Sequence, residues 1–266
     1  MLRYTLLFLL IICICIDLYS QEHSFSKQVS TFEIDAPQLG GKKKIWMYLP
    51  KGYDKSKQKY PAIYMHDAQN LFDKKTSYAG EWAVDETLDS INAQIIVVGI
   101  AHGNEKRLEE LTPFVHSKHG GGKADLYLDF IVQTLKPHID IKYRTKKSAK
   151  NTCIFGSSLG GLASMYAVLK YPATFGKAGI FSPSFWYSEK IYDMLENAPK
   201  SKAKIYMMCG DSEDAEMVPD FERMHTLLAR NRCYCLNLTK KKIVKGGQHN
   251  EKLWRENFKE AIEWLF

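Results

Sequence analysis

Apolar residues occur along the chain in two alternating patterns, which predict strands and helices in turn. Continuous apolar runs, typical of strands buried on both faces of a parallel sheet, lie at residues 60–65, 94–101, 152–155, 177–181 and 204–209, with a last strand at 236–244. Helical spacing occurs at residues 81–91, 124–135, 162–170 and 252–265. Strands that alternate with helices predict an α/β fold with a mostly parallel central sheet and helices on both faces.

The first two apolar segments predict an antiparallel pair at the edge of this sheet. Residues 29–34 and 44–49 carry the apolar and aromatic side chains, and a turn separates them. Residues 102–123 show neither the helical nor the strand pattern of apolar residues, and they contain three consecutive glycines, which indicates a mobile loop. A loop of this length inside a compact domain is usually functional. The helix that follows is expected to end before Pro137.

The length and composition are those of a globular protein. A chain of 266 residues can bury one substantial α/β core, so residues 21–266 are expected to form a single domain. The formal net charge is +7, but the lysines are scattered in the sequence, at residues 42–44, 51–59, 146–150 and 240–245. We therefore expect a solvated basic surface, with no nucleic-acid partner and no membrane contact beyond export.

Residues 1–20 have the pattern of a secretory signal peptide. Arg3 precedes an apolar run at 6–16, and a cleavage site is expected near Ser20. The run is shorter than the roughly 20 apolar residues that a transmembrane helix needs. Cys13 could indicate a lipoprotein, but Ile12 before it is larger than a lipid-attachment site normally accepts. The mature protein is therefore expected to be exported, to the periplasm or beyond.

Four cysteines would remain after this cleavage, namely Cys153, Cys209, Cys233 and Cys235. The first two fall in predicted central strands, where a free cysteine behaves as a small hydrophobic residue. The last two are separated by one residue, which is too tight for the usual zinc motif. Export permits a disulfide, but the sequence does not require one.

Residues 151–162 contain a Gly-x-Ser-x-Gly motif with Ser158 at its centre. An apolar run leads into the motif, and Gly156, Gly160 and Gly161 surround the serine before the helical pattern begins. A serine on a sharp strand-to-helix turn has a strained backbone, and side chains at the flanking positions would collide with it. The motif therefore makes Ser158 a candidate nucleophile.

Acidic residues and a histidine follow two later predicted strands. Asp211, Glu213 and Asp214 come after one of them, and His249 comes after the last. Ligands of parallel sheets bind beyond the carboxyl ends of the strands, where all these residues are expected to meet. The order serine, acid, histidine is that of the α/β-hydrolases. His249 would take the proton of Ser158 during attack, and one of the three carboxylates would orient the histidine.

An oxyanion hole is expected beside the candidate nucleophile. Charge that develops on a carbonyl oxygen is best stabilised by fixed donors such as backbone N–H groups. We expect one donor from Leu159, which directly follows the serine, and the other from Gln69, in the loop after the strand at 60–65. These residues predict acyl-transfer chemistry at one edge of the sheet.

Four motifs resemble those of one esterase family of α/β-hydrolases, which includes esterase D, feruloyl and acetyl xylan esterases, enterochelin-type siderophore esterases and mycolyltransferases. They are Tyr64-Met-His-Asp-Ala-Gln-Asn-Leu-Phe-Asp73, Phe155-Gly-Ser-Ser-Leu-Gly-Gly161, Phe181-Ser-Pro-Ser-Phe-Trp186 and Gly246-Gly-Gln-His-Asn-Glu-Lys-Leu-Trp254. The resemblance extends from about residue 45 to residue 266.

This resemblance implies an α/β-hydrolase fold and a Ser-His-acid mechanism without a metal or an organic cofactor. It favours Glu213 as the acid, because the family usually places its carboxylate three residues after the glycine that ends this strand, here Gly210. Asp211 and Asp214 remain alternatives. One departure is Ala68, where relatives often have glycine, and its methyl group could narrow the oxyanion loop.

Several aromatic residues are candidates for substrate binding. Trp82 and Trp186, together with Phe185 and Tyr187, could line a pocket for an acyl group or a sugar. The alternative for each of them is an ordinary place in the core or at its rim.

Arg107, in the long loop, is a further candidate for substrate binding. Its guanidinium could bind a substrate carboxylate or phosphate through two parallel hydrogen bonds. The alternative is a salt bridge to Glu109 or Glu110 that fixes the loop.

A metal site is the weakest of the candidate sites. His66 and Asp67 could bind a metal with His102, His116 or His119. These residues share no ligand spacing, however, so no metal site is expected.

The sequence as a whole predicts an exported serine esterase that forms an acyl-enzyme. Its expected substrate is a small-molecule or carbohydrate ester, either a carbohydrate-linked acyl ester or a siderophore-like ester. One alternative is acyl transfer to a sugar acceptor, and another is a non-catalytic binding module on a hydrolase fold. The acyl group, the alcohol and the oligomeric state do not follow from the sequence.

Overall fold

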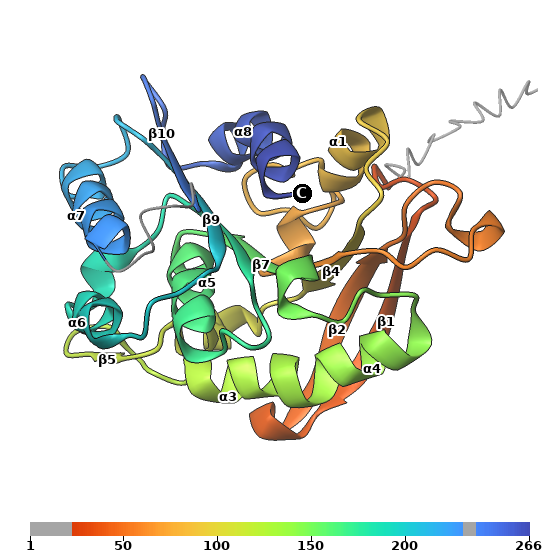
Figure 1. Cartoon of the computed structure of the whole chain (residues 1–266), viewed down its shortest axis with the longest axis horizontal. Coiled ribbons are helices and arrows are strands. Elements are labelled where there is room, and N and C mark those ends of the chain that lie inside the picture. The colour runs from red at the N-terminus through yellow and green to blue at the C-terminus, as the bar shows by residue number, and fades with distance from the viewer. Residues whose placement is uncertain (1–22, 231–237) are drawn as a thin grey trace, which may run out of the picture.

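The computed structural model describes residues 23–230 and 238–266, which are built around an eight-stranded sheet (Figure 1). The strand order is β1-β2-β4-β3-β7-β8-β9-β10. The strands are β1 (Val29–Ala36), β2 (Gly41–Tyr48), β3 (Ala62–Met65), β4 (Ile96–Ile100), β7 (Thr152–Ser157), β8 (Lys177–Phe181), β9 (Lys204–Gly210) and β10 (Thr239–Val244). Neighbouring strands from β4 to β10 are parallel, so the predicted mostly parallel sheet is confirmed.

Helices cover both faces of the sheet, and each face has its own apolar core. One face is covered by α1 (Val84–Ser90) and α8 (Glu251–Leu265). The other is covered by α2 (Arg107–Leu111), α3 (Ala124–Asp129), α4 (Lys136–Lys142), α5 (Leu159–Lys170), α6 (Lys190–Asn197) and α7 (Met217–Arg230). The sequence pattern missed α2, α6 and α7.

The antiparallel pair at the sheet edge forms as predicted. β1 pairs with β2 in a register that runs from Val29 opposite Tyr48 to Ala36 opposite Gly41. Gly40 closes the turn between them with a φ of 67°, a backbone conformation that glycine adopts without steric cost.

The expected helix end before Pro137 is wrong. The helix continues from α3 through a π-helical segment, Phe130–Leu135, into α4. Pro137 falls in the first turn of α4 after this segment. A proline inside a continuing helix removes one intrahelical hydrogen bond, and the π-helical segment directly before Pro137 is the local change in hydrogen bonding that accompanies it.

Residues 102–123 contain more regular secondary structure than the absence of a hydrophobic period predicted. It contains α2 and a small hairpin of β5 (Val115–His116) and β6 (Gly120–Gly121). A buried ion pair fixes α2, since Lys43 Nζ lies 2.6 Å from both carboxylate oxygens of Glu110. A five-residue helix and two-residue strands are too short to produce a visible period.

Cys153 and Cys209 are buried free cysteines, as expected. Cys233 and Cys235 lie outside the described residues, as does the predicted signal peptide with Cys13. Within residues 23–230 and 238–266, no helix has the length and apolar character that crossing a membrane requires.

Candidate active site

Ser158 occupies a strained turn between β7 and α5. Its φ of 56° and ψ of −124° lie outside the regions that residues other than glycine usually adopt, which costs about 1–3 kcal/mol. Gly156 makes the turn possible, because a Cβ there would lie 2.7 Å from the His66 ring and 2.8 Å from the backbone of Gly160. The serine side chain is only half-buried and lies 3.3 Å from the hydroxyl of Ser184.

Glu213, rather than either neighbouring acid, contacts the histidine. His249 Nδ1 lies 2.6 Å from Glu213 Oε2, and the carboxylate is completely buried. Asp211 instead accepts hydrogen bonds from Ser212 Oγ and the backbone N–H of Gly246. Asp214 accepts the backbone N–H groups of residues 216 and 217 at the start of α7. Of the three candidate acids, only Glu213 is positioned to orient His249.

A chain of hydrogen bonds fixes the carboxylate oxygen of Glu213 that does not contact His249. Its Oε1 accepts the N–H of Gly210 at 2.6 Å and the hydroxyl of Ser182 at 2.7 Å. The Ser182 hydroxyl in turn accepts the indole N–H of Trp254 at 2.8 Å. Trp254 also packs edge-on against the His249 ring, at 5.2 Å between ring centres. One tryptophan therefore supports both the acid and the histidine.

Ser158 and His249 line one pocket of about 420 Å³ at the carboxyl ends of the strands. Asp67, His102 and Arg107 form part of the same wall. Tyr78 also lines the pocket although its side chain is 95% exposed, so it stands at the rim. Sequence reasoning did not identify Tyr78, because a single tyrosine in a polar loop carries no distinctive pattern.

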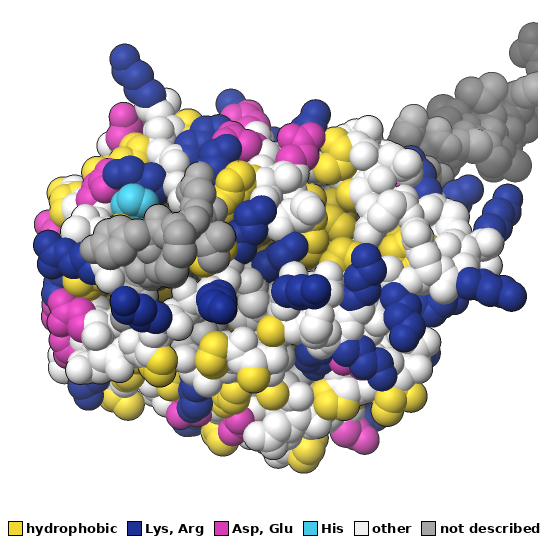
Figure 2. Space-filling model, in the orientation of Figure 1, with side chains coloured by type: hydrophobic (Ala, Val, Ile, Leu, Met, Phe, Trp, Pro, Cys, Tyr) yellow, Lys and Arg dark blue, Asp and Glu magenta, His cyan; other side chains and the backbone are white. Residues whose placement is uncertain are grey.

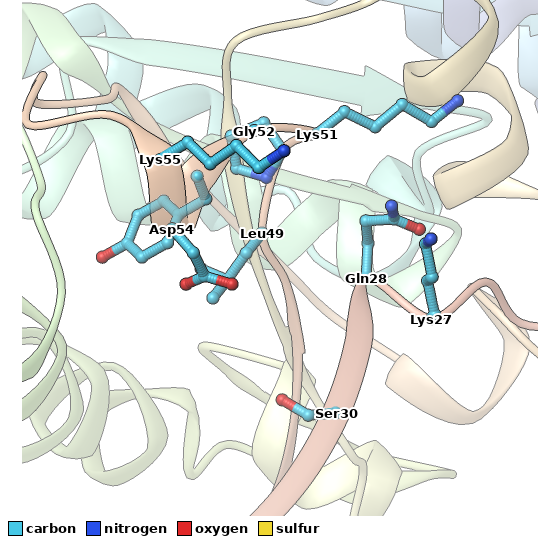
Figure 3. A pocket seen from close by; sticks show the side chains of 10 residues that line it. Lys27, Gln28, Ser30, Leu49, Lys51, Gly52, Asp54 and Lys55 are labelled. Carbon is cyan, nitrogen blue, oxygen red and sulfur yellow. The ribbon is translucent and has the colours of Figure 1, made fainter.

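A larger pocket, of about 540 Å³, lies away from these residues. It is formed by the start of β1 and the loop after β2, with Lys27, Lys51 and Lys55 around it (Figure 3). Its lining residues include Ser30 but no histidine that could serve as the base, so its chemistry does not match that of a Ser-His site.

The sequence matches the protein family described as "Putative esterase" over residues 36–265. The chain belongs to this esterase family. It is a carboxylic ester hydrolase, as the resemblance of its motifs implied.

Three relatives are similar to the esterase in sequence. YbbA of Bacillus subtilis is 28% identical over 242 residues, which are 85% of this chain and 93% of that protein. An endo-1,4-beta-xylanase/feruloyl esterase of Xylanibacter ruminicola is 26% identical over 180 residues, 64% of this chain and 23% of that protein. A siderophore triacetylfusarinine C esterase of Aspergillus fumigatus is 29% identical over 135 residues, 48% of this chain and 45% of that protein. The esterase thus spans less than half the length of the last two.

Solved structures share its fold. The BES protein from Bacillus cereus superposes with a TM-score of 0.72 at 21% identity, covering 91% of this chain and 95% of that one. The predicted α/β-hydrolase fold is confirmed.

Arg107 of the esterase forms a bidentate ion pair that the sequence did not indicate. Its Nε and Nη2 lie 2.7 and 2.8 Å from the carboxylate oxygens of Asp67. The alternative considered for Arg107, a salt bridge to Glu109 or Glu110, is wrong, because those acids pair with Lys123 and Lys43. Burial alone would raise the pKa of Asp67, but the charge and hydrogen bonds of Arg107 hold it below the usual range.

The two expected oxyanion donors lie in helical segments that directly follow β7 and β3. Leu159 is the first residue of α5, where an N–H has no intrahelical acceptor. Gln69 lies in the 3₁₀ turn Ala68–Asn70 directly after β3, and its side chain accepts the N–H of His102 at 3.3 Å. Ala68, the departure from the family pattern, is buried, and its methyl group faces Gly99 of β4.

The aromatic candidates differ in their positions. Trp82 is only 3% exposed and stacks on Phe181 in the core, at 5.7 Å between ring centres, so its expected place in the pocket is wrong. Phe185 and Tyr187 are buried as well. Trp186 is 49% exposed and lies outside the residues that line the pocket, although it follows Ser184 by two positions.

His66 and Asp67 each interact with another side chain of the protein. His66 Nδ1 lies 2.8 Å from the hydroxyl of Tyr127, and Asp67 pairs with Arg107. Burial lowers the pKa of His66 to about 4, so the imidazole is neutral at physiological pH. In the part of the chain that the structure describes, no three His, Cys, Asp or Glu side chains are grouped to hold a metal ion.

Proposed function

We propose that the protein is an exported serine esterase with Ser158 as nucleophile, His249 as general base and Glu213 as the orienting acid. The observation that carries this proposal is the 2.6 Å contact between His249 and the buried Glu213, beside a serine on a strained elbow. With Nδ1–H donated to Glu213, the other ring nitrogen of His249 is free to accept the serine proton. A lone serine hydroxyl is a weak nucleophile at neutral pH and needs such a base.

The proposed reaction has two steps. Ser158 Oγ attacks the ester carbonyl while His249 takes its proton, and the tetrahedral oxyanion is held by the N–H groups of Leu159 and Gln69. The carbon–oxygen bond to the alcohol then breaks, His249 returns the proton to the leaving alcohol, and an acyl-enzyme remains. Water repeats the sequence, with His249 again as base, and releases the carboxylic acid and the free Ser158.

The proposed substrate is a carbohydrate-linked acyl ester or a siderophore-like ester. Sequence relatives named as a feruloyl esterase and a siderophore esterase support these two classes. The pocket favours a polar, uncharged contact at Arg107, because Asp67 already neutralises its charge. Tyr78, exposed at the rim, and Trp186, exposed two positions after Ser184, are proposed to contact the larger part of such a substrate.

Export is proposed from the pattern of residues 1–20. A basic residue, an apolar run and a cleavage site near Ser20 support it. Amino-terminal sequencing of protein purified from the producing cells should begin near Gln21, and an intact N-terminus would contradict cleavage there.

The test of the catalytic proposal is Ser158→Ala. Because the nucleophile is lost, hydrolysis of a short-chain p-nitrophenyl ester should fall by about 10⁴- to 10⁶-fold. Ser148→Ala, at an exposed position before β7, is the matched control and should keep full activity. A fluorophosphonate probe should label the wild type and the control but not Ser158→Ala.

Two results would contradict this proposal. Retained turnover in Ser158→Ala would exclude this serine as nucleophile. A wild-type protein that neither hydrolyses esters nor reacts with the probe would favour a binding module on a hydrolase fold.

A further inference from the structure

Lysines gather at the amino ends of four adjacent parallel strands, opposite the pocket. They are Lys59 before β3, Lys146, Lys147 and Lys150 before β7, Lys177 at the start of β8, and Lys202 and Lys204 at the start of β9. These positions are far apart in the sequence, and composition alone suggested a scattered basic surface. The sheet topology, β3-β7-β8-β9, places them side by side instead.

Backbone hydrogen bonds tie the segments that carry these lysines together. The N–H of Lys146 donates to Tyr60 O at 2.7 Å, which joins the segments before β3 and β7. Gly176 N–H donates to Ala149 O, and Lys204 N–H donates to Gly176 O, each at 2.9 Å. With about 4.8 Å between neighbouring strands, these lysines span roughly 14 Å across the sheet.

The seven side chains are exposed or half-buried. Two of them contact the end of the chain, since Lys204 Nζ donates to the backbone oxygen of Trp264 and Lys177 Nζ lies over the Phe266 ring. Among the described residues, none of the seven forms an ion pair with an acid, whereas Lys240, Lys241 and Lys242 on β10 each pair with a glutamate. Burial, and then the charges of Lys204 and Lys146, lower the pKa of Lys177 to about 8. The like charges are therefore close enough to repel one another.

Basic side chains also predominate in the corresponding part of the space-filling view (Figure 2). In the orientation of Figure 1, the segments that lead into β7 and β9 cross the middle of the view. In that region of Figure 2, lysine and arginine side chains are spread over the surface with few acidic side chains between them. The pocket of Figure 3 adjoins this region, since Arg144 donates to the backbone oxygen of Tyr53 in its wall.

We propose that these seven lysines, the lysine face, dock the protein onto an anionic lipid surface. Lysine ammonium groups are non-directional charges that can each attract a lipid phosphate without a fixed geometry. Ser158, Glu213 and His249 all follow the carboxyl ends of their strands, so the pocket points away from a surface bound at the amino ends.

The same geometry favours a lipid surface over an acidic polysaccharide. A polymer held on the lysine face would present its ester groups at the wrong end of the sheet, whereas a bilayer leaves the pocket open to substrates in solution. The inference does not depend on the catalytic roles proposed above, because it concerns the opposite end of the molecule.

The test compares two triple variants of equal net charge in vesicle cosedimentation. The first, Lys146→Gln, Lys147→Gln and Lys150→Gln, removes part of the lysine face. The control, Lys75→Gln, Lys245→Gln and Lys252→Gln, removes three exposed lysines near the other end of the sheet. Vesicles of phosphatidylcholine with 30% phosphatidylglycerol, at about 50 mM salt, are compared with vesicles of phosphatidylcholine alone. Binding to the neutral vesicles measures any contribution of residues 6–16, which all variants share.

The wild type and the control should bind the anionic vesicles and lose this binding as salt is raised. The first variant should bind about a hundredfold more weakly, since each lysine near such a surface contributes roughly a fivefold factor. Thermal unfolding and hydrolysis of a soluble ester should be unchanged in both variants. Equal weakening in both would show a dependence on net charge alone and overturn the proposal. So would equal binding to neutral vesicles, or binding to polygalacturonate without binding to vesicles.

Discussion

Glu213 receives hydrogen bonds from three different strand ends. Gly210 ends β9, Ser182 follows β8, and His249 follows β10. Ser182 is itself held in an unusual conformation, with a φ of 40° and no exposed surface. Strain of this kind persists only where surrounding contacts enforce it, and here the enforced result is a hydroxyl aimed at the carboxylate.

Replacing Ser182 by alanine should therefore weaken catalysis without removing any group that reacts. One donor to the Glu213 carboxylate is lost and the Trp254 N–H is left unpaired, so kcat should fall by about 10- to 100-fold with little change in KM. Trp254→Phe leaves both the Gly210 N–H and the Ser182 hydroxyl in place as donors to Glu213, so it should cost less.

The kinetic constants and the stability of the Ser182 variant together separate positioning from general damage. A positioning defect lowers kcat while KM and the melting temperature stay close to those of the wild type. Reduced activity that is explained by a lower melting temperature would exclude the positioning role.

At the scale of elements, strand positions could be predicted because buried parallel strands are continuous apolar runs. The run at 177–181 coincides with β8, and the order of strand ends placed Ser158, Glu213 and His249 at one edge. The expectation that a helix ends before a proline failed at Pro137, where the helix continues through a π-helical segment. Local sequence rules do not include the tertiary contacts that decide such cases. The Arg107–Asp67 pair was missed because two charges 40 residues apart have no pattern that identifies them as partners.

Helix α2, which carries Arg107, depends on one buried ion pair. Glu110 accepts hydrogen bonds from Lys43 on β2 and from the N–H of Gly103 after β4, so it joins three elements. Glu110→Ala leaves the Lys43 charge buried and unpaired, and should lower the free energy of unfolding by about 3–5 kcal/mol in urea titrations. Glu109→Ala, on the same helix but paired at the surface with Lys123, should change it by less than about 0.5 kcal/mol.

A double variant distinguishes charge burial from loss of packing. Adding Lys43→Met to Glu110→Ala removes the unpaired buried charge of Lys43 and should recover much of the lost free energy of unfolding. If the double variant is as unstable as Glu110→Ala, the ion pair is not what fixes α2.

For the molecule as a whole, the sheet separates two kinds of chemistry. The carboxyl ends of the strands carry the pocket with Ser158 and His249, and the amino ends carry the lysine face. Beside the elbow, directly after β3, lies the buried His66, which contacts Tyr127 and is influenced by the charges of Asp67 and Arg107. Because His66 is neutral in the folded protein, the free energy of unfolding depends on pH.

The sign of this dependence follows from the lowered pKa of His66. The unfolded chain binds a proton at this histidine near pH 6.5, but the folded protein does so only near pH 4. Protons therefore favour the unfolded state between these values, and stability is lost as the pH falls through this window. From pH 7 to pH 4.5 the loss due to His66 should be about 2 kcal/mol. His66→Gln, which cannot titrate, should show a pH dependence of unfolding shallower by that amount, whereas His119→Gln, at an exposed position, should match the wild type. Equal slopes for all three proteins in urea titrations would mean that His66 takes up a proton as readily in the folded protein as in the unfolded chain.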